Sequence, residues 1–322
     1  MAIEHARARA LPKPWGVDDL HPWSTARYDG NAIGEIWYER PDIAAAADPS
    51  LLLKLLFTSQ PLSIQVHPDD AVAHLMGLPR GKTEAWYILS AALEAKVALG
   101  LSRCLTPQKL REAIDDGSIS DLVVWHTVSA DDVIFVPAGT IHAIGAGLVI
   151  AELQQRSDAT FRLFDFGRQR ELQIENAIAV AKAGPADFQV RPSKFTAERK
   201  LLVSSPHFVF ERIDLAPNSS WYLDADQETW LLVLSGSAIA GSFDVATGDA
   251  LFAQTDRVDI HPGATGVVGL VAYTGGRPIP NLLQRLPQPG SINVSRPPEM
   301  QACASRPQVK KLPKAGRVET IR

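Results

Sequence analysis

The feature that most constrains the fold is a repeated alternation of short apolar runs with turns rich in glycine and proline. The 322 residues include 22 glycines and 23 prolines, which are spread along the chain. Runs typical of strands occur throughout, for example at 33–39, 51–57, 132–136 and 230–235. Short strands separated by turns at roughly 8–12 residues are typical of jelly rolls and barrels. The sequence therefore predicts a mainly β fold.

The composition excludes several classes of protein. A hydrophobic content of 46%, a charged content of 21% and a formal net charge of −4 are those of a globular protein without a basic excess. We therefore expect no nucleic-acid partner and no binding to an acidic membrane surface. The sequence contains no apolar run of about 18 residues, so it predicts no membrane span. Charged residues interrupt any signal-peptide core at the N-terminus. Two distant cysteines, Cys104 and Cys303, favour the reducing cytoplasm over a disulfide framework.

We expect two β-rich domains followed by a tail. The first, residues 1–190, would begin with an extended N-terminal arm and carry a helical insertion near 105–122. Thr106 suits the N-cap of that helix, because a proline follows it directly. The second domain, residues 191–286, shows no cluster of His, Glu and Cys and is expected to support the first. The tail, residues 287–322, is rich in Pro, Lys and Arg, and we expect part of it to be poorly ordered.

A short run, Ser63-Ile-Gln-Val-His67, carries the first sign of chemistry. Successive side chains of a strand point to opposite faces, so Ile64 and Val66 would lie on one face and Ser63, Gln65 and His67 on the other. A polar row that includes an imidazole is unusual in a core. It is explained if that face lines a cavity that holds a metal ion, although a lone strand histidine is more often packed and hydrogen-bonded.

Two later segments offer further metal ligands. In Lys82-Thr-Glu84-Ala-Trp86 the alternation puts Lys82 and Glu84 on one face, and His142 follows a Pro-Ala-Gly-Thr turn. Two histidines and a glutamate suit zinc, which takes nitrogen and oxygen donors and keeps an open position when it is catalytic. Gln65 would be a weak, neutral fourth ligand. Ligands scattered over strands follow no tight spacing rule, so structural roles for these residues stay open.

Four segments in this order resemble the type I phosphomannose isomerases, especially their short bacterial form. The similarity is strong over about residues 12–180 and only general beyond. The segments are Pro61-Leu-Ser-Ile-Gln-Val-His-Pro-Asp69, Gly81-Lys-Thr-Glu-Ala-Trp-Tyr87, Val136-Pro-Ala-Gly-Thr-Ile-His-Ala143 and Glu152-Leu-Gln-Gln-Arg-Ser-Asp-Ala-Thr-Phe-Arg-Leu-Phe-Asp165.

The resemblance implies two cupin-like jelly-roll domains and one zinc ion per chain. It implies a cytoplasmic isomerase, monomeric or homodimeric, that acts on a small-molecule sugar phosphate and interconverts mannose 6-phosphate and fructose 6-phosphate through a cis-enediol. Carried over position by position, it implies the zinc ligands Gln65, His67, Glu84 and His142, the active-site residues Arg162, Glu152 and Lys82, and substrate or phosphate contacts at Ser63, Lys54, Lys82 and Arg162.

The chemistry of an aldose–ketose isomerisation agrees with these roles. A base near C1 and C2 must move the proton, and Glu152 and Lys82 are both candidates. Glu152 has a structural alternative as a partner of Arg156 or Arg162. An isomerase for another aldose, or a sugar-binding cupin without catalysis, would fit the same pattern.

Two cations have similar alternatives. Arg162 could be an ordinary surface residue of a strand rather than a phosphate ligand. Lys54 interrupts the apolar run 51–57 and needs an anionic partner if that strand is buried. A phosphate group or a structural carboxylate would serve Lys54 equally.

Overall fold

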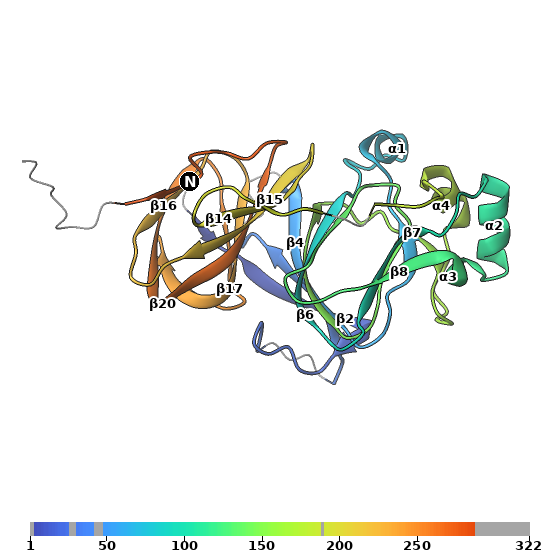
Figure 1. Ribbon diagram of the computed structural model, residues 1–322, viewed down its shortest axis with the longest axis horizontal. Helices are drawn as coiled ribbons and strands as arrows, with labels where there is room; N and C mark the ends of the chain where they lie inside the picture. The colour runs from blue at the N-terminus through green and yellow to red at the C-terminus, as the bar shows by residue number, and fades with distance from the viewer. Residues whose placement is uncertain (1–2, 26–29, 42–47, 188–189, 287–322) are drawn as a thin grey trace, which may run out of the picture. The chain divides into compact units, whose positions relative to one another are not determined.

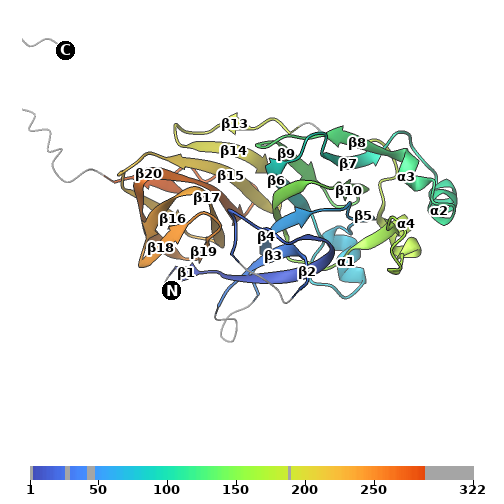
Figure 2. The ribbon, with the colours of Figure 1, turned by 90° about the horizontal axis from the view of Figure 1, so that it is seen from below.

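Antiparallel β-sheets are the predominant regular structure in the computed structural model, so the predicted mainly β fold is confirmed (Figures 1 and 2). The structure describes residues 3–25, 30–41, 48–187 and 190–286. Residues through Leu286 group as one compact unit. The tail expected at 287–322 lies outside the described residues.

The first sheet, here called the Lys54 sheet, begins with the N-terminal segment. We expected this segment to be an extended arm, but β2 pairs with β3 as part of the sheet, while β1 (Glu4–His5) pairs with a strand of the C-terminal half. In spatial order the sheet contains β2 (Arg7–Val17), β3 (Ile33–Glu39), β4 (Leu51–Thr58), β11 (Leu148–Gln155), β6 (Glu84–Ala91) and β9 (Val133–Val136).

The apolar run of β4 is explained by burial of the Lys54 sheet on both faces. Leu53, Leu55 and Phe57 pack in the core shared with the C-terminal half, whereas Leu56 packs toward a second sheet. Side chains alternate along a strand, so Lys54 lies on the same face as Leu56. This face looks into the space between the two sheets.

The second sheet, here called the His142 sheet, carries the helices of residues 107–122 and 174–180 on its outer face. Ile64 and Val66 pack in a cluster with apolar residues of α2, α3 and α4, as the predicted alternation of this strand requires. Its order is β12 (Phe161–Phe164), β5 (Ile64–Val66), β10 (His142–Ile144), β7 (Lys96–Leu101) and β8 (Val123–Thr127). The helices are α1 (Asp70–Leu75), α2 (Pro107–Asp115), α3 (Ile119–Leu122) and α4 (Ile174–Val180).

The predicted helix after Thr106 is present as α2. The Thr106 side chain accepts a hydrogen bond from the backbone N–H of Lys109, and Pro107 occupies the first helical position. Gly117, just beyond the helix, has a φ of 79°, a left-handed conformation that glycine adopts without a steric cost. Local sequence is therefore sufficient to define both ends of this helix.

The C-terminal half forms a third sheet that shares a core with the Lys54 sheet. Phe210 and Trp230 pack in the same cluster as Leu53 and Leu55, so the core crosses the boundary that we predicted near residue 190. The strands are β13 (Ser193–Lys194), β14 (Arg199–Ser204), β15 (Phe208–Leu215), β16 (Trp221–Ala225), β17 (Thr229–Ala240), β18 (Phe243–Ala246), β19 (Ala250–Ala253), β20 (Asp256–Thr274) and β21 (Leu283–Arg285).

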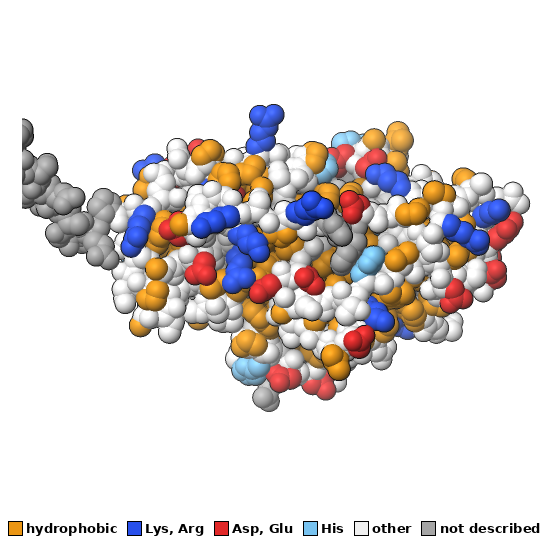
Figure 3. Space-filling view, in the orientation of Figure 1, with side chains coloured by type: hydrophobic (Ala, Val, Ile, Leu, Met, Phe, Trp, Pro, Cys, Tyr) orange, Lys and Arg blue, Asp and Glu red, His pale blue; other side chains and the backbone are white. Residues whose placement is uncertain are grey.

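Basic and acidic side chains are interspersed on the face shown in Figure 3. This distribution agrees with the small net charge of −4. Among the described residues, no helix has the length and apolar character needed to cross a membrane.

Candidate metal centre and active site

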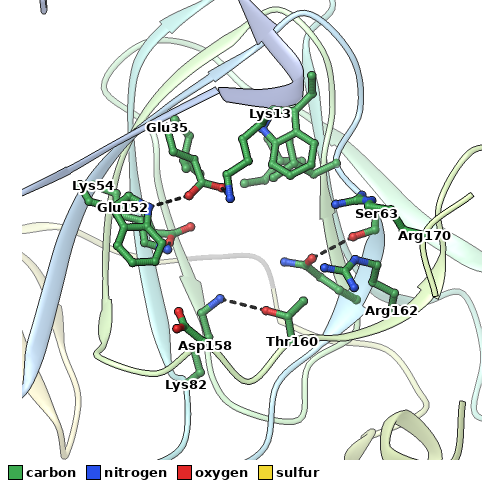
Figure 4. Close-up of a pocket in the computed structure, with 16 residues that line it drawn as sticks. Lys13, Glu35, Lys54, Ser63, Lys82, Glu152, Asp158, Thr160, Arg162 and Arg170 are labelled. Carbon is green, nitrogen blue, oxygen red and sulfur yellow. Dashed lines mark hydrogen bonds and ion pairs between the residues drawn. The ribbon is translucent and has the colours of Figure 1, made fainter. Parts of the chain in front are cut away.

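A pocket of about 470 Å³ opens between the Lys54 sheet and the His142 sheet (Figure 4). Its lining is unusually rich in charge, with cations and carboxylates facing each other across the cavity. Six residues singled out from the sequence line it: Lys54, Ser63, Gln65, Lys82, Glu152 and Arg162.

His67, Glu84 and His142 come together directly behind this lining. The three side chains are almost completely buried, and their potential ligand atoms lie within 4.8 Å of one another. His67 follows β5, Glu84 opens β6 and His142 opens β10, so the cluster depends on both sheets. Gln65 and Lys82 contact the cluster and line the pocket.

The hydrogen bonds of the two histidines determine which ring nitrogen faces the cluster. Nδ1 of His67 lies 2.8 Å from the carbonyl oxygen of Ala159, and Nδ1 of His142 lies 2.8 Å from that of Thr140. A carbonyl oxygen only accepts, so each Nδ1 carries a proton and donates it. Each Nε2 therefore presents a lone pair to Glu84, as in metal-binding histidines.

These lone pairs are the best test of whether the cluster fits a metal ion. Nε2 of His67 lies 3.2 Å from Oε1 of Glu84, and neither atom completes a hydrogen bond among the described residues. Nε2 of His142 lies 3.8 Å from the other Glu84 oxygen. Two acceptors that face each other at such distances repel unless a cation is bound to both. The cluster therefore fits a metal ion, and its nitrogen and oxygen donors are those that zinc accepts.

Burial and neighbouring charges keep the cluster in the protonation state that a metal requires. Burial and the Lys82 ammonium lower the pKa of His67 to about 3, and burial lowers the pKa of His142. Although burial opposes it, Lys82 and His67 hold the pKa of Glu84 well below its usual range. At neutral pH both imidazoles are therefore neutral and the carboxylate is charged, which is the ligand state that binds metals.

Gln65 is adjacent to the cluster but turns its amide nitrogen toward it. Nε2 of Gln65 lies 3.3 Å from Nε2 of His142, and the amide oxygen accepts a hydrogen bond of 3.0 Å from Ser63. A ligand role would use the amide oxygen, so the assignment of Gln65 as a ligand stays a prediction.

Lys82 lies at the boundary between the cluster and the pocket. Its ammonium is 3.1 Å from Oε1 of Glu84 and donates a hydrogen bond of 3.3 Å to the hydroxyl of Thr160. The contact with Glu84 has the distance of an ion pair without the geometry of a hydrogen bond. Lys82 therefore neutralises Glu84 and still presents its ammonium to the pocket.

Glu152 and Lys54 form a buried pair on the opposite wall. The Lys54 ammonium donates hydrogen bonds of 3.1 Å to Glu152 and 2.6 Å to Gln154. Burial and the nearby Glu84 charge raise the pKa of Glu152, while Lys54 opposes that shift. The sequence left open whether Lys54 meets a phosphate group or a structural carboxylate. In the structure its partner is the carboxylate of Glu152. Glu152 is paired with Lys54 rather than with Arg156 or Arg162.

Arg162 and Ser63 lie together across the pocket from Glu152 (Figure 4). The Nε of Arg162 is buried and has no hydrogen-bond partner in the part of the chain that the structure describes. Burial and the neighbouring Arg170 lower the pKa of Arg162, because two guanidinium groups repel each other in this wall. Such a pair of cations with an unused donor is suited to binding an anion.

Reasoning from the sequence missed several charged residues of the pocket. Glu35, on β3, accepts a hydrogen bond of 2.6 Å from Trp37 and forms an ion pair of 3.2 Å with Lys13. Asp158 and Arg170 also line the pocket. The alternation along 33–39 could have placed Glu35 on one face with Trp37. No alternation of polar and apolar residues identifies Arg170, because this residue follows a turn and is not part of a strand.

Comparison with known proteins agrees with this fold and identifies relatives of the chain. No family model matches the sequence. The chain is similar to the mannose-6-phosphate isomerase of Streptococcus mutans, with 38% identity over 196 residues, which span 56% of this chain and 60% of that protein. It is similar to a probable mannose-6-phosphate isomerase of Bacillus subtilis, with 31% identity over 228 residues, which span 66% of this chain and 70% of that protein.

Solved structures show the same fold. The crystal structure of a Bacillus subtilis mannose 6-phosphate isomerase matches with a TM-score of 0.74 at 22% identity, covering 85% of this chain and all of that one. A mutant of Salmonella typhimurium phosphomannose isomerase matches with a TM-score of 0.67 at 13% identity, over 85% of this chain and all of that one. Together with the sequence identity to the Bacillus subtilis relative, this places the chain in the mannose-6-phosphate isomerase family.

Proposed function

We propose that this protein is a zinc-dependent isomerase that interconverts mannose 6-phosphate and fructose 6-phosphate in the cytoplasm. The observation that carries the proposal is a single pocket that adjoins a metal-binding cluster, a carboxylate of raised pKa and a pair of arginines. These are the groups that an aldose–ketose isomerisation of a sugar phosphate requires. The relatives with this name support the same reaction.

His67, Glu84 and His142 would hold the metal, with the amide oxygen of Gln65 as a fourth donor once that amide has turned. A zinc ion held by these residues would supply a Lewis acid for polarising the oxygens of the sugar. Lys82 keeps Glu84 ionised and presents its ammonium to the sugar hydroxyls. The nearly complete burial of the cluster shields the three ligand side chains from bulk water.

Glu152 is our candidate for the proton transfer between C2 and C1 through a cis-enediol. Its raised pKa makes it a better base than an ordinary glutamate, and Lys54 holds its carboxylate in place. Lys82 is the alternative base. It is held between Glu84 and Thr160, which favours a role in orienting hydroxyl groups.

Arg162, Arg170 and Ser63 would receive the phosphoryl group on the other side of the pocket. One guanidinium group can donate two hydrogen bonds to a pair of phosphate oxygens, and the hydroxyl of Ser63 adds a further donor. Lys54 was a further candidate for this contact, but its hydrogen bonds to Glu152 and Gln154 favour a role at the base.

The decisive assay measures fructose 6-phosphate formation from mannose 6-phosphate by the zinc-loaded protein, with a chelated sample and zinc add-back as controls. Glu152→Gln should retain the bound metal and lose at least about 100-fold in kcat, as expected for loss of a general base. Glu112→Gln, on the exposed side of α2, is the matched control and should behave as the wild type.

Two outcomes would change the assignment. A Glu152→Gln variant with nearly full activity would move the base to Lys82. Wild-type protein that binds zinc without turning over mannose 6-phosphate would contradict the proposed reaction, and other aldoses or sugar binding without catalysis would then be tested.

A further inference from the structure

The turn that follows β12 places two arginines around one buried carboxylate. Asp165 accepts hydrogen bonds from the Nε and Nη2 atoms of Arg168, at 3.1 and 3.0 Å. It also accepts a hydrogen bond of 2.7 Å from Nε of Arg170, and Nη2 of Arg170 donates to its other oxygen. The Asp165 side chain is only 2% exposed, so these contacts replace its hydration.

The backbone of this turn takes an unusual path that makes the arrangement possible. Phe166 has a φ of 51° and Gly167 a φ of 82°. Glycine adopts such values freely, but a bulky residue rarely does. The turn reverses the chain so that the backbone N–H of Arg168 reaches the carbonyl oxygen of Asp165 at 3.1 Å. Strain of this kind persists where the surroundings hold a residue in place, often next to a functional site.

The two arginines are used differently. Arg168 donates a further hydrogen bond of 2.8 Å to the carbonyl oxygen of Pro61, which anchors the turn to the chain just before β5. Arg170 lines the pocket, and its guanidinium lies 5.0 Å from the centre of the Trp15 ring, which also lines it. Asp165 therefore connects Arg168, which anchors the turn, to Arg170, which lines the pocket.

The balance of charge in this wall explains why a fixed carboxylate is needed. Arg162, Arg168 and Arg170 carry three positive charges, whereas Asp165 carries one negative charge, with Glu171 as a further acid near Arg162. Two guanidinium groups that line one pocket wall repel each other and would separate if they were free to move. Asp165 uses both oxygens to hold Arg170 in one orientation, and the remaining positive charge is left for a ligand.

We infer that Asp165 is a positioning residue for anion binding, which acts by orienting Arg170 beside Arg162 for the phosphoryl group of the substrate. The inference rests on the proposed function, because it assigns the arginine wall to the phosphate of the sugar. Asp165 does not line the pocket itself, so its effect on a ligand is indirect, and Arg170 is the hydrogen-bond partner of Asp165 that does line the pocket. It is therefore expected to control the affinity for phosphorylated ligands rather than the proton transfer.

The test compares Asp165→Asn with wild type. Asparagine keeps the shape but replaces one acceptor oxygen by a donor, which cannot bond to a guanidinium group. KM for mannose 6-phosphate should rise by about tenfold or more, while kcat changes by less than about threefold. Binding of inorganic phosphate to the zinc-loaded protein, followed by phosphorus NMR, should weaken to a similar extent. Asp116→Asn, in the exposed turn after α2, is the matched control.

A double-mutant cycle separates positioning from a general structural effect. In an Arg170→Met background, Asp165→Asn should add less than about a twofold further loss of phosphate affinity, because the group that it positions is already gone. Additive effects would overturn the inference, as would unchanged phosphate binding in Asp165→Asn. If Asp165→Asn does not fold, Arg170→Met alone tests the inference. Unchanged phosphate binding in Arg170→Met would overturn it, because Arg170 is the residue that Asp165 is inferred to position.

The phosphate measurement also keeps the two proposals apart. Wild-type turnover of mannose 6-phosphate with an unchanged KM in Asp165→Asn would overturn only the positioning role. Absence of turnover in the wild type, together with phosphate binding that depends on Asp165, would overturn only the proposed reaction. Wild-type protein that does not bind phosphate would overturn the role of Asp165.

Discussion

Lys54 and Glu152 are directly opposite each other on the neighbouring strands β4 and β11, and the ammonium of Lys54 donates a hydrogen bond of 3.1 Å to the carboxylate. Each of the two side chains lies in a strand that is buried on both faces. Together with Gln154 they form a buried, hydrogen-bonded polar group within the Lys54 sheet. Removing one partner of such a pair leaves an uncompensated charge, which makes the pair a sensitive test of the site.

Lys54→Met should move the acidic limb of the kcat profile to higher pH. Lys54 opposes the rise in the pKa of Glu152, so its removal raises that pKa further. More of the carboxylate is then protonated at a given pH, and a base must be unprotonated to act. The measurement is kcat against pH for the variant and for Lys200→Met, an exposed control on β14. An unshifted limb with reduced kcat would show that Glu152 is not the titrating base.

Glu84→Ala and His142→Ala should each lose both the bound metal and the activity. Each substitution removes one of three donors in a buried cluster, and the remaining two cannot hold the ion tightly. The metal content of the purified protein is measured by elemental analysis beside the activity. His261→Ala, an exposed histidine that contacts Ser220, should keep its metal. Full metal content in either cluster variant would contradict the ligand assignment.

Arg162→Met should weaken the use of mannose 6-phosphate far more than that of mannose. The guanidinium has a buried, unused donor in the pocket wall, which a phosphoryl oxygen would satisfy. Loss of a hydrogen bond to a charged group is worth about 1.5–3 kcal/mol, or roughly 10- to 150-fold in kcat/KM. Specificity constants for both sugars are compared in the variant and the wild type. Equal losses for both sugars would place Arg162 outside the phosphate contact.

Phe210→Ala should destabilise residues of both halves together. Phe210 is fully buried in the cluster that also contains Leu53 and Leu55 of the Lys54 sheet. Truncating a buried phenylalanine costs about 3–5 kcal/mol of the free energy of unfolding. Denaturant unfolding followed by tryptophan fluorescence and by circular dichroism should show one transition, shifted equally in both signals. Two separate transitions would indicate that the halves unfold independently.

The sequence predicted the parts of the site that follow from local alternation. Ile64 and Val66 had to be buried together, and this alone put Ser63, Gln65 and His67 on the opposite face of β5. Ligand chemistry singled out Glu84 and His142 as candidate partners of His67, and the resemblance to a family supported the same set. The helix after Thr106 was equally local, because its cap and its first residue are adjacent in the chain.

Tertiary structure decided the contacts that depend on register and on turns. Lys54 needed an anion in any case, but the pairing of β4 with β11 selected Glu152. Arg170 and Asp165 entered the site through a turn in which Phe166 adopts a left-handed conformation. Local propensity disfavours that conformation, which occurs where Phe166 packs against Phe164 and the apolar cluster on the helix side of the His142 sheet. Sequence periodicity thus determined which faces are polar, while pairing between distant strands determined which charges meet, because such contacts have no local signature.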